Sequence, residues 1–250
     1  MTKTLLITGA SRGIGAATAR MAAAQGYDVA VNYAHNREAA DQVVADIRKV
    51  GRKAVAIGAD VSSIEGITTL FAAVDKEFGR LDAFFNNAGA FMPASKFVDI
   101  APERLAQIVA LNATGAFMCA QAAVRRMSTR LGGKGGGIVN MSSLAAKLGG
   151  AGESTDYGFT KGAIDTLTIG LAKELAGEGI RVNAVRPGLI YTEIHAGMGF
   201  PDRVDKLKDQ VPLKRGGSPE EVGDVVLWLL SEKSSYVTGA LIDVGGGRGL

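Results

Sequence analysis

The sequence predicts a single α/β domain, a doubly wound parallel sheet of seven strands with helices on both faces. Short apolar runs alternate with longer helical patterns along the whole chain, as in consecutive strand–helix units. Runs such as Val29-Ala30-Val31 are almost continuously apolar, which is typical of strands covered on both sides. No linker divides the chain, so we expect one domain over residues 1–250.

The expected elements alternate in order along the chain. The strands are short apolar runs, expected at Thr4–Thr8, Asp28–Tyr33, Lys53–Gly58, Ala83–Asn86, Gly137–Ser142, Arg181–Arg186 and Ala240–Val244. The helices between them are expected at Gly13–Gln25, Asn36–Val50, Ser62–Phe78, Pro102–Arg130, Tyr157–Gly177 and Ser218–Leu230. The stretch Pro187–Gly217 is long and irregular, and compact domains keep such loops mainly as lids or binding loops, so we expect a substrate lid there.

Composition excludes several classes of protein. Basic and acidic residues are interspersed at a net charge of +3, which gives little support to nucleic-acid binding but suits an anionic ligand. Cys119 is the only cysteine, so no internal disulfide can form. The first apolar run is too short for a signal peptide, and no stretch is expected to reach membrane-spanning length. We therefore expect a cytoplasmic protein.

A glycine-rich loop, Thr8–Gly15, follows the first strand and opens the first helix. Glycines at this place let the backbone turn sharply and approach a pyrophosphate, which the free N–H groups and dipole of the helix stabilise. The spacing is G-x-x-x-G-x-G, which differs from the common dinucleotide fingerprint. Taken alone, the loop is a weak signal for nucleotide binding.

Together with four other motifs, this loop resembles the short-chain dehydrogenase/reductase family over nearly the whole chain. The motifs are Asp60-Val61, Asn86-Asn87-Ala88-Gly89, the Tyr157-x-x-x-Lys161 pair and Pro187-Gly188 with Thr192 close behind. The resemblance implies a Rossmann-type fold and hydride transfer between a nicotinamide cofactor and a carbonyl or alcohol. The cofactor-binding residues that it implies, with those we expect to read the ribose, are Gly9, Ser11, Arg12, Gly13, Ile14, Gly15, Asn32, Arg37, Asp60, Val61, Asn87, Ala88, Gly89, Tyr157, Lys161, Pro187, Gly188, Ile190 and Thr192.

The residues after the second strand favour NADP over NAD. A carboxylate about 20 residues beyond the glycine loop usually binds the adenosine ribose in NAD enzymes. Here the strand ends Val31-Asn32-Tyr33 without one. Arg12, His35 and Arg37 are available instead, and an arginine suits a phosphate. We therefore expect Arg12 and Arg37 near the 2′-phosphate.

Tyr157 and Lys161 form the expected chemical centre. Four residues apart on a helix, they lie on one face, one turn apart. A nearby ammonium favours phenolate, so we expect Lys161 to lower the pKa of Tyr157 and let it act as acid in reduction and base in oxidation. By resemblance, Lys161 also binds the nicotinamide ribose.

Two further residues complete the catalytic set that the resemblance implies. Ser143, at the end of a strand, can hydrogen-bond the substrate oxygen and Tyr157, with Ser142 as an alternative. Asn112 lies in the middle of a helical stretch, where asparagine is locally unfavourable. The matching family position holds a water that links the lysine to solvent. No metal-ligand spacing is apparent, because the two histidines, His35 and His195, have no partner at such a spacing.

The substrate is less defined, and three hypotheses stay open. A small carbonyl or sugar reductase is favoured, since the chain is similar to glucose-1-dehydrogenase-like members. It is also similar to 3-oxoacyl-carrier-protein reductases, for which Arg125, Arg126, Arg130 and Lys173 could form a docking patch. A non-catalytic NADP(H)-binding sensor is the third. The expected pocket residues are Phe91, Met92, Leu144, Leu148, Glu153, Ser154, Ile194, His195 and Met198.

The helices Pro102–Arg130 and Tyr157–Gly177 carry more apolar surface than one sheet can cover. A second subunit would bury the rest, and pairing across two-fold axes closes such an assembly. Members of the family are commonly tetramers. We therefore expect a homotetramer.

Overall fold

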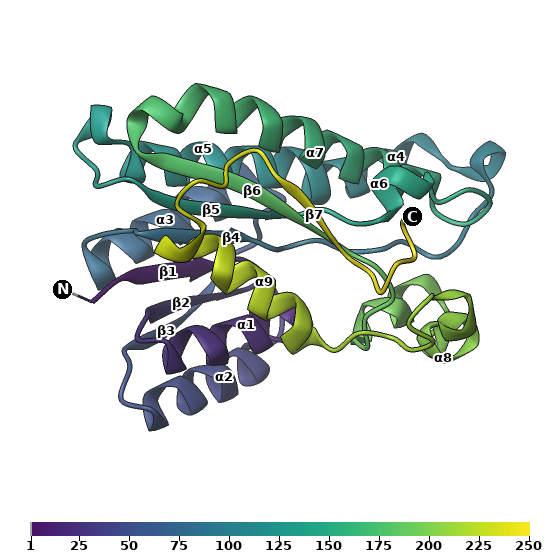
Figure 1. The fold of residues 1–250 in the computed structure, drawn as a ribbon, viewed down its shortest axis with the longest axis horizontal. Coiled ribbons are helices and arrows are strands. Elements are labelled where there is room, and N and C mark those ends of the chain that lie inside the picture. Colours follow the sequence, from purple (N-terminus) through teal and green to yellow (C-terminus); the bar gives the residue numbers. More distant parts are fainter. Residues whose placement is uncertain (1) are drawn as a thin grey trace.

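The computed structural model describes residues 2–250 and contains one seven-stranded parallel sheet (Figure 1). The strand order is β3-β2-β1-β4-β5-β6-β7, so the chain winds outward from β1 in one direction and then from β4 in the other. This is a Rossmann-type doubly wound sheet, and the predicted fold class is confirmed. The strands are β1 Thr4–Ile7, β2 Asp28–Tyr33, β3 Ala54–Gly58, β4 Ala83–Asn86, β5 Gly136–Met141, β6 Ile180–Pro187 and β7 Leu241–Val244.

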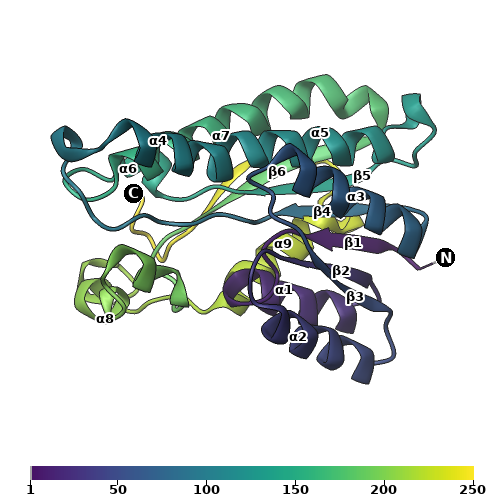
Figure 2. The ribbon, with the colours of Figure 1, turned by 180° about the vertical axis from the view of Figure 1, so that it is seen from behind.

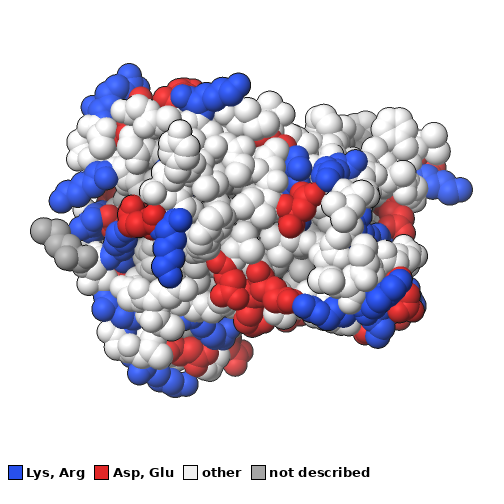
Figure 3. Space-filling model, in the orientation of Figure 1, with Lys and Arg blue, Asp and Glu red and all other residues white. Residues whose placement is uncertain are grey.

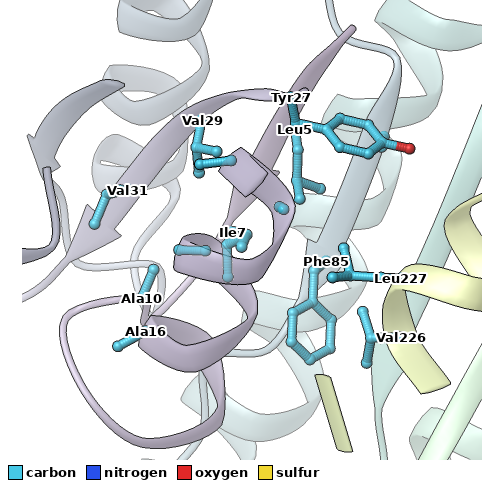
Figure 4. Packing of buried hydrophobic residues seen from close by; sticks show 14 of the residues in the cluster. Leu5, Ile7, Ala10, Ala16, Tyr27, Val29, Val31, Phe85, Val226 and Leu227 are labelled. Carbon is cyan, nitrogen blue, oxygen red and sulfur yellow. The ribbon is translucent and has the colours of Figure 1, made fainter. Parts of the chain in front are cut away.

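Two layers of helices cover the sheet, and alternate side chains along each strand pack against one layer or the other. In β1, Leu5 and Ile7 pack in one core with α1 (Gly13–Ala24), α2 (Arg37–Lys49) and α9 (Pro219–Leu230). Figure 4 shows part of this core, with Ala16 of α1 and Val226 and Leu227 of α9. The side chain between them, Leu6, packs in the opposite core with α3 (Ile64–Phe78), α5 (Ala116–Met127) and α7 (Thr155–Leu175). The two layers are visible from both sides of the molecule (Figures 1 and 2).

Side-chain caps account for where several helices begin. The Asn36 and Ser63 side chains accept hydrogen bonds from backbone N–H groups in the first turns of α2 and α3. Ser218 and Glu221 form a reciprocal capping box at the start of α9, where Pro219 occupies the first helical position. These local signals explain why the predicted starts agree with the structure to within two residues.

The predicted helix Pro102–Arg130 is interrupted. It consists of α4 (Pro102–Val109), a π-helical turn at Ala110–Gly115 and α5. At Gly115 an added Cβ would lie 2.3 Å from the Val61 carbonyl oxygen, so only glycine lets this turn approach the end of β3. The insertion re-aims Asn112, which lies inside the turn.

The same helix corrects the expectation that no segment reaches membrane-spanning length. Residues Pro102–Met127 form a helix of 26 residues that is long and apolar enough to cross a membrane by length and composition. Core helices of globular domains pass the same test, and Cys119, Ala120 and Ala123 of α5 are fully buried within the fold.

The segment 187–217 is more ordered than the sequence indicates. It contains a 3₁₀ stretch at Glu193–Met198, α8 (Arg203–Leu207) and a 3₁₀ turn at Lys208–Gln210. It lies beyond the carboxyl ends of the strands (Figures 1 and 2). The short helix α6 (Ala145–Leu148) was not predicted, and further 3₁₀ turns occur at Phe97–Asp99, Thr129–Leu131, Ala176–Glu178 and Glu232–Ser234.

Candidate active site

A cavity of about 740 Å³ opens at the carboxyl ends of the strands. The loops after β1 and β4 meet there, where the winding of the sheet reverses, which is where open α/β sheets bind their ligands. The predicted cofactor and catalytic residues all line this cavity except Asn112 and Arg37. Segments far apart in the sequence are thus brought to one site.

Backbone geometry holds the glycine loop in shape. Gly9 and Gly13 have φ values of +62° and +53°, in the left-handed region that favours glycine. An added Cβ on Gly15 would lie 2.6 Å from the Gly9 carbonyl oxygen. Asn87 donates from Nδ2 to the carbonyl oxygens of Thr8 and Gly9 at 2.7 and 3.0 Å, so the loop after β4 fastens the loop after β1.

The loop ends at a helix N-terminus that suits an anion. Arg12 occupies the N-cap of α1 without a side-chain capping hydrogen bond in the described chain, and the first turn of α1 carries no acidic residue. The N–H groups there and the helix dipole therefore favour a negative ligand. Together with the glycines, these residues fit the pyrophosphate of a dinucleotide.

At the other end of the cavity, Asn32 and Asp60 hold the loops that would receive the adenosine. Asn32 Oδ1 accepts from the Gly9 N–H at 3.1 Å, and its Nδ2 donates to the carbonyl oxygens of Ile57 and Ala59 at 3.2 and 3.0 Å. Asp60 Oδ1 accepts from the Ser62 N–H at 2.9 Å. Asn32 is therefore a support for the loop at Gly9, with its amide already committed.

The structure separates the two arginines that we expected near the 2′-phosphate. Arg12 lines the cavity, as do Tyr33 and His35. Arg37 does not line it: the side chain is 78% exposed, and Nε lies 3.4 Å from Asp41 one turn along α2. The structure therefore does not bring Arg37 into the cavity lining with Arg12, because the first turn of α2 directs this side chain to solvent.

Ser143, Tyr157 and Lys161 converge in the cavity. The Ser143 hydroxyl lies near enough to the Tyr157 phenol to lower its pKa, and Lys161 Nζ lies 5.5 Å from the centroid of the Tyr157 ring. Lys161 Nζ donates to the Met141 carbonyl oxygen at 2.7 Å. The end of β5 and the first turns of α7 thus place a phenol, a hydroxyl and an ammonium together.

Burial dominates the protonation of this group. It raises the pKa of Tyr157 to about 12, a rise that the nearby Ser143 hydroxyl opposes. It lowers the pKa of Lys161 to about 8, against the attraction of the Asp165 carboxylate. Desolvation therefore sets the direction of the Tyr157 shift, and the lowering of the phenol pKa that we expect from Lys161 stays a prediction.

The two serines at the end of β5 have different partners. Ser142 is buried, and its hydroxyl donates to Asp165 Oδ1 at 2.6 Å. Ser143 contacts Tyr157, and its oxygen also accepts from the Ala145 N–H at 3.1 Å. Ser143 is therefore the serine in position to meet a substrate oxygen, and Ser142 is engaged in the protein interior.

The Asn112 side chain holds the loop after β4 through two hydrogen bonds to the backbone of Ala90. Oδ1 accepts from the Ala90 N–H and Nδ2 donates to the Ala90 carbonyl oxygen, both at 2.9 Å. An added Cβ on Gly89 would lie 3.2 Å from Asn112 Oδ1 and 3.4 Å from Lys161 Nζ, so the asparagine and the lysine approach the same backbone. The family resemblance implied a place for this residue near Lys161, and the hydrogen bonds to Ala90 were not predicted.

Three of the nine expected substrate residues line the cavity: Phe91, Ile194 and His195. The Phe91 ring lies on Tyr157 with centroids 3.9 Å apart. The buried His195 places Nε2 3.0 Å from the Ile190 carbonyl oxygen, so Nε2 carries the proton; burial lowers the pKa of the ring. The other six expected residues, Met92, Leu144, Leu148, Glu153, Ser154 and Met198, lie outside the cavity lining, and unpredicted lining residues include Gln107, Ala110, Leu111 and Glu193.

The arginines suggested as a carrier-docking patch lie at the opposite end of the sheet. Arg126 pairs with Asp75 at 2.6 Å and Arg130 with Glu178 at 3.0 Å, where α5 ends and β5 begins. That end carries the N-terminus, whereas α6 and α8 lie at the other end (Figures 1 and 2). On the face in Figure 3, Lys and Arg are scattered among Asp and Glu. The idea that this patch lies near the active site is wrong.

Comparison with known protein sequences finds oxidoreductases along the full chain. The family described as Enoyl-(Acyl carrier protein) reductase matches residues 9–248. The chain is 49% identical over 243 residues to the uncharacterized oxidoreductase YgfF of Escherichia coli (strain K12), covering 97% of this chain and 98% of that protein. It is 37% identical over 251 residues to the 3-oxoacyl-[acyl-carrier-protein] reductase FabG of Staphylococcus aureus (strain Mu50), covering 99% and 98%.

Solved structures agree with these sequence matches. Acetoin dehydrogenase YohF from Salmonella typhimurium superposes with a TM-score of 0.88 at 34% identity, covering 99% of this chain and 97% of that one. The angucycline C-6 ketoreductase LanV, solved with bound NADP, gives a TM-score of 0.89 at 32% identity, covering 98% and 95%. Both structures match the chain over nearly its whole length.

Proposed function

Because this chain belongs to the short-chain dehydrogenase/reductase family of oxidoreductases, we propose that it reduces a small carbonyl compound with NADPH. The observation that carries the proposal is the meeting of Ser143, Tyr157 and Lys161 in one cavity with the glycine loop. When bound, the nicotinamide supplies the hydride.

The side chains of the protein handle the proton. The Ser143 hydroxyl donates a hydrogen bond to the substrate carbonyl oxygen and holds it beside the Tyr157 phenol. Tyr157 gives its proton to that oxygen as negative charge develops there. The Lys161 ammonium binds the ribose hydroxyls and favours the phenolate left behind.

The preference for NADPH rests on the end of β2. No carboxylate follows Asn32 there, while Arg12 lines the same cavity as Asn32. LanV, a relative of known structure, binds NADP. The test is the ratio of kcat/KM with NADPH to that with NADH in the wild type and in Arg12→Gln. We expect a ratio well above one that falls at least tenfold in the variant, and a ratio below one in the wild type would contradict the proposal.

Arg37→Gln is the matched control. It removes the same charge from the start of α2, outside the cavity. We expect the cofactor ratio to stay within about twofold of the wild type, because exposed charges at such places contribute little. A drop equal to that of Arg12→Gln would show that the α2 arginine reaches the phosphate.

The substrate end of the cavity favours small carbonyl compounds. Phe91 and Ile194 supply apolar surface beside Tyr157, and His195 supplies a neutral imidazole. YohF is described as an acetoin dehydrogenase. A panel of diketones, aldehydes and sugars, read by NADPH absorbance, tests this class. No turnover on any of them, with tight NADPH binding, would favour a non-catalytic NADP(H)-binding sensor.

A 3-oxoacyl-carrier-protein reductase is the second candidate, favoured by the 37% identity with FabG. The basic residues that would receive the carrier lie at the wrong end of the sheet. Acetoacetyl thioesters belong in the same panel, both as the coenzyme A ester and on the carrier protein. A preference of more than about tenfold for the carrier-bound form would favour this candidate over the small-carbonyl reductase.

We also propose a homotetramer. Large apolar side chains stay exposed along the two long helices: Phe117 on α5 and Phe159 and Ile169 on α7 are 51%, 64% and 40% exposed. A second subunit across a two-fold axis would cover them. Light scattering at micromolar concentration should give four times the mass of one chain. Phe159→Glu should lower that mass, and a monomeric wild type would contradict the proposal.

A further inference from the structure

The mechanism above gives no function to Asp165, a carboxylate that is buried close to the catalytic side chains. It lies one turn beyond Lys161 on α7, with 8% of its surface exposed. Its Oδ1 accepts from the Ser142 hydroxyl at 2.6 Å, and its Oδ2 accepts from Nη2 and Nε of Arg186 at 2.6 and 3.0 Å. Burying a charge is costly unless it is paired and hydrogen-bonded, and both oxygens of Asp165 are.

Ser142 connects this carboxylate to the reacting groups. Its two chain neighbours are Met141, whose carbonyl oxygen accepts from Lys161 Nζ, and Ser143, which contacts Tyr157. The Ser142 hydroxyl also lies 3.2 Å from the Lys161 carbonyl oxygen. Ser142 therefore holds the end of β5 to α7. It does so between Met141, which contacts Lys161, and Ser143, which contacts Tyr157.

We propose that Asp165 is a positioning residue for this reaction: it fixes the end of β5 against α7 through Ser142 and supplies the negative charge that offsets Lys161 in the buried site. The predicted effect on turnover rests on the function proposed for Lys161. The predicted effect on the pKa of Lys161 does not, because it depends only on charges within the protein.

The charges around Lys161 make this assignment specific. On its own helix Lys161 faces the neutral Tyr157 phenol and the Asp165 carboxylate, whose attraction works against the lowering of the Lys161 pKa by burial. Arg186, on β6, partly neutralises Asp165. Beyond it, Asp243 on β7 lies 3.5 Å from Arg186 and is paired with Lys147 of α6 at 2.9 Å. Opposite changes to Asp165 and Arg186 should therefore move Lys161 in opposite directions.

The test measures the protonation of Lys161 directly, without turnover. The protein is labelled with ¹³C-lysine, the Lys161 signal is assigned by its loss in Lys161→Met, and the signal is titrated by NMR. In Asp165→Asn the pKa of Lys161 should fall by about one unit, because an opposite charge nearby is lost. In Arg186→Gln it should rise by a smaller amount, because Asp165 loses its cation.

Asp243→Asn is the matched control. It removes a carboxylate from the same network of ion pairs, but one that is paired with Arg186 and is farther from Lys161 along the network. The Lys161 titration should shift in it by well under half a unit. An unmoved titration in Asp165→Asn, or shifts of the same sign in Asp165→Asn and Arg186→Gln, would overturn the proposal. Should Asp165→Asn fail to fold, Arg186→Gln decides alone: a rise supports the counter-charge and its absence refutes it.

Kinetics then test the positioning part. Ser142→Ala keeps the charge of Asp165 but removes the hydrogen bond that holds the end of β5 to it. We therefore expect kcat for reduction to fall at least fivefold, while the alkaline limb of the pH profile stays at the same pH. In Asp165→Asn that limb should move to lower pH. An unchanged kcat in Ser142→Ala would refute the positioning role. Because the NMR titration needs no substrate, failure of the proposed reductase activity and failure of this proposal are distinguishable.

Discussion

The sharpest prediction concerns the proton donor, through Tyr157→Phe. The change removes one hydroxyl and keeps the ring that lies on Phe91 at 3.9 Å, so the shape of the cavity is retained. Positioned general acids contribute about 10²- to 10⁴-fold to a rate. We therefore expect kcat for carbonyl reduction to fall by that factor, a barrier increase of about 3 to 5 kcal/mol.

Stability should change little in the same variant. A neutral hydrogen bond contributes about 0.5 to 1.5 kcal/mol, so losing the contact with Ser143 costs no more than that, and the Ser143 oxygen keeps its bond from the Ala145 N–H at 3.1 Å. Removing the phenol hydroxyl also leaves no unpaired charge in the site, because the phenol is neutral.

Cofactor binding should also change little in this variant. The NADPH dissociation constant should stay within about twofold of the wild type, because Lys161 and the glycine loop are untouched.

The assay is NADPH oxidation followed by absorbance, with 2,3-butanedione as substrate and NADPH fluorescence to measure binding. Tyr236→Phe is the control, because it deletes the same hydroxyl from a fully exposed side chain and should change neither quantity. A Tyr157→Phe enzyme with kcat within about threefold of the wild type would mean that another group protonates the product.

Three further predictions follow from the same site. The pKa of Lys161 is about 8, so kcat/KM for reduction should be constant below that pH and fall above it as the ammonium is lost. Tyr157, with a pKa of about 12, stays protonated over this range. A profile that is flat from pH 6 to 10 would exclude this role for Lys161. Gly15→Ala should weaken NADPH binding at least a hundredfold, because its Cβ would lie 2.6 Å from the Gly9 carbonyl oxygen; Gly170→Ala, in open space on α7, should not, and equal binding in both would refute the loop geometry. Residues 187–217 should gain hydrogen-exchange protection when NADPH and substrate bind, since a lid closes over its ligand; unchanged protection would show that this segment is no lid.

Local patterns in the sequence determined the fold class and most of the elements. The alternation of apolar strands with helical stretches predicted the seven-stranded parallel sheet, and the strand bounds differ from the prediction by at most one residue at each end. The glycine loop and the Tyr157–Lys161 spacing are equally local, since they depend on a turn and on helical periodicity. Such features follow from neighbours along the chain, so a sequence is sufficient to detect them.

The parts that sequence could not supply depend on contacts between distant segments. The exposure of Arg37, the packing of the Phe91 ring on Tyr157 and the hydrogen bonds of Asn112 to Ala90 each depend on how a loop or turn packs after the sheet has formed. The raised pKa of Tyr157 likewise reflects burial under surfaces that no local pattern encodes.

Asp165 illustrates the difference most clearly. In the sequence it is one acidic residue on a helix, one turn beyond Lys161, with nothing to mark it. The parallel order of β5, β6 and β7 brings Ser142, Arg186 and Asp243 to the same edge of the sheet, and only there do two of them hold its two oxygens. The sequence determined which side chains were available, and the sheet topology decided which of them meet, because partners far apart in the chain become neighbours only when the strands pair.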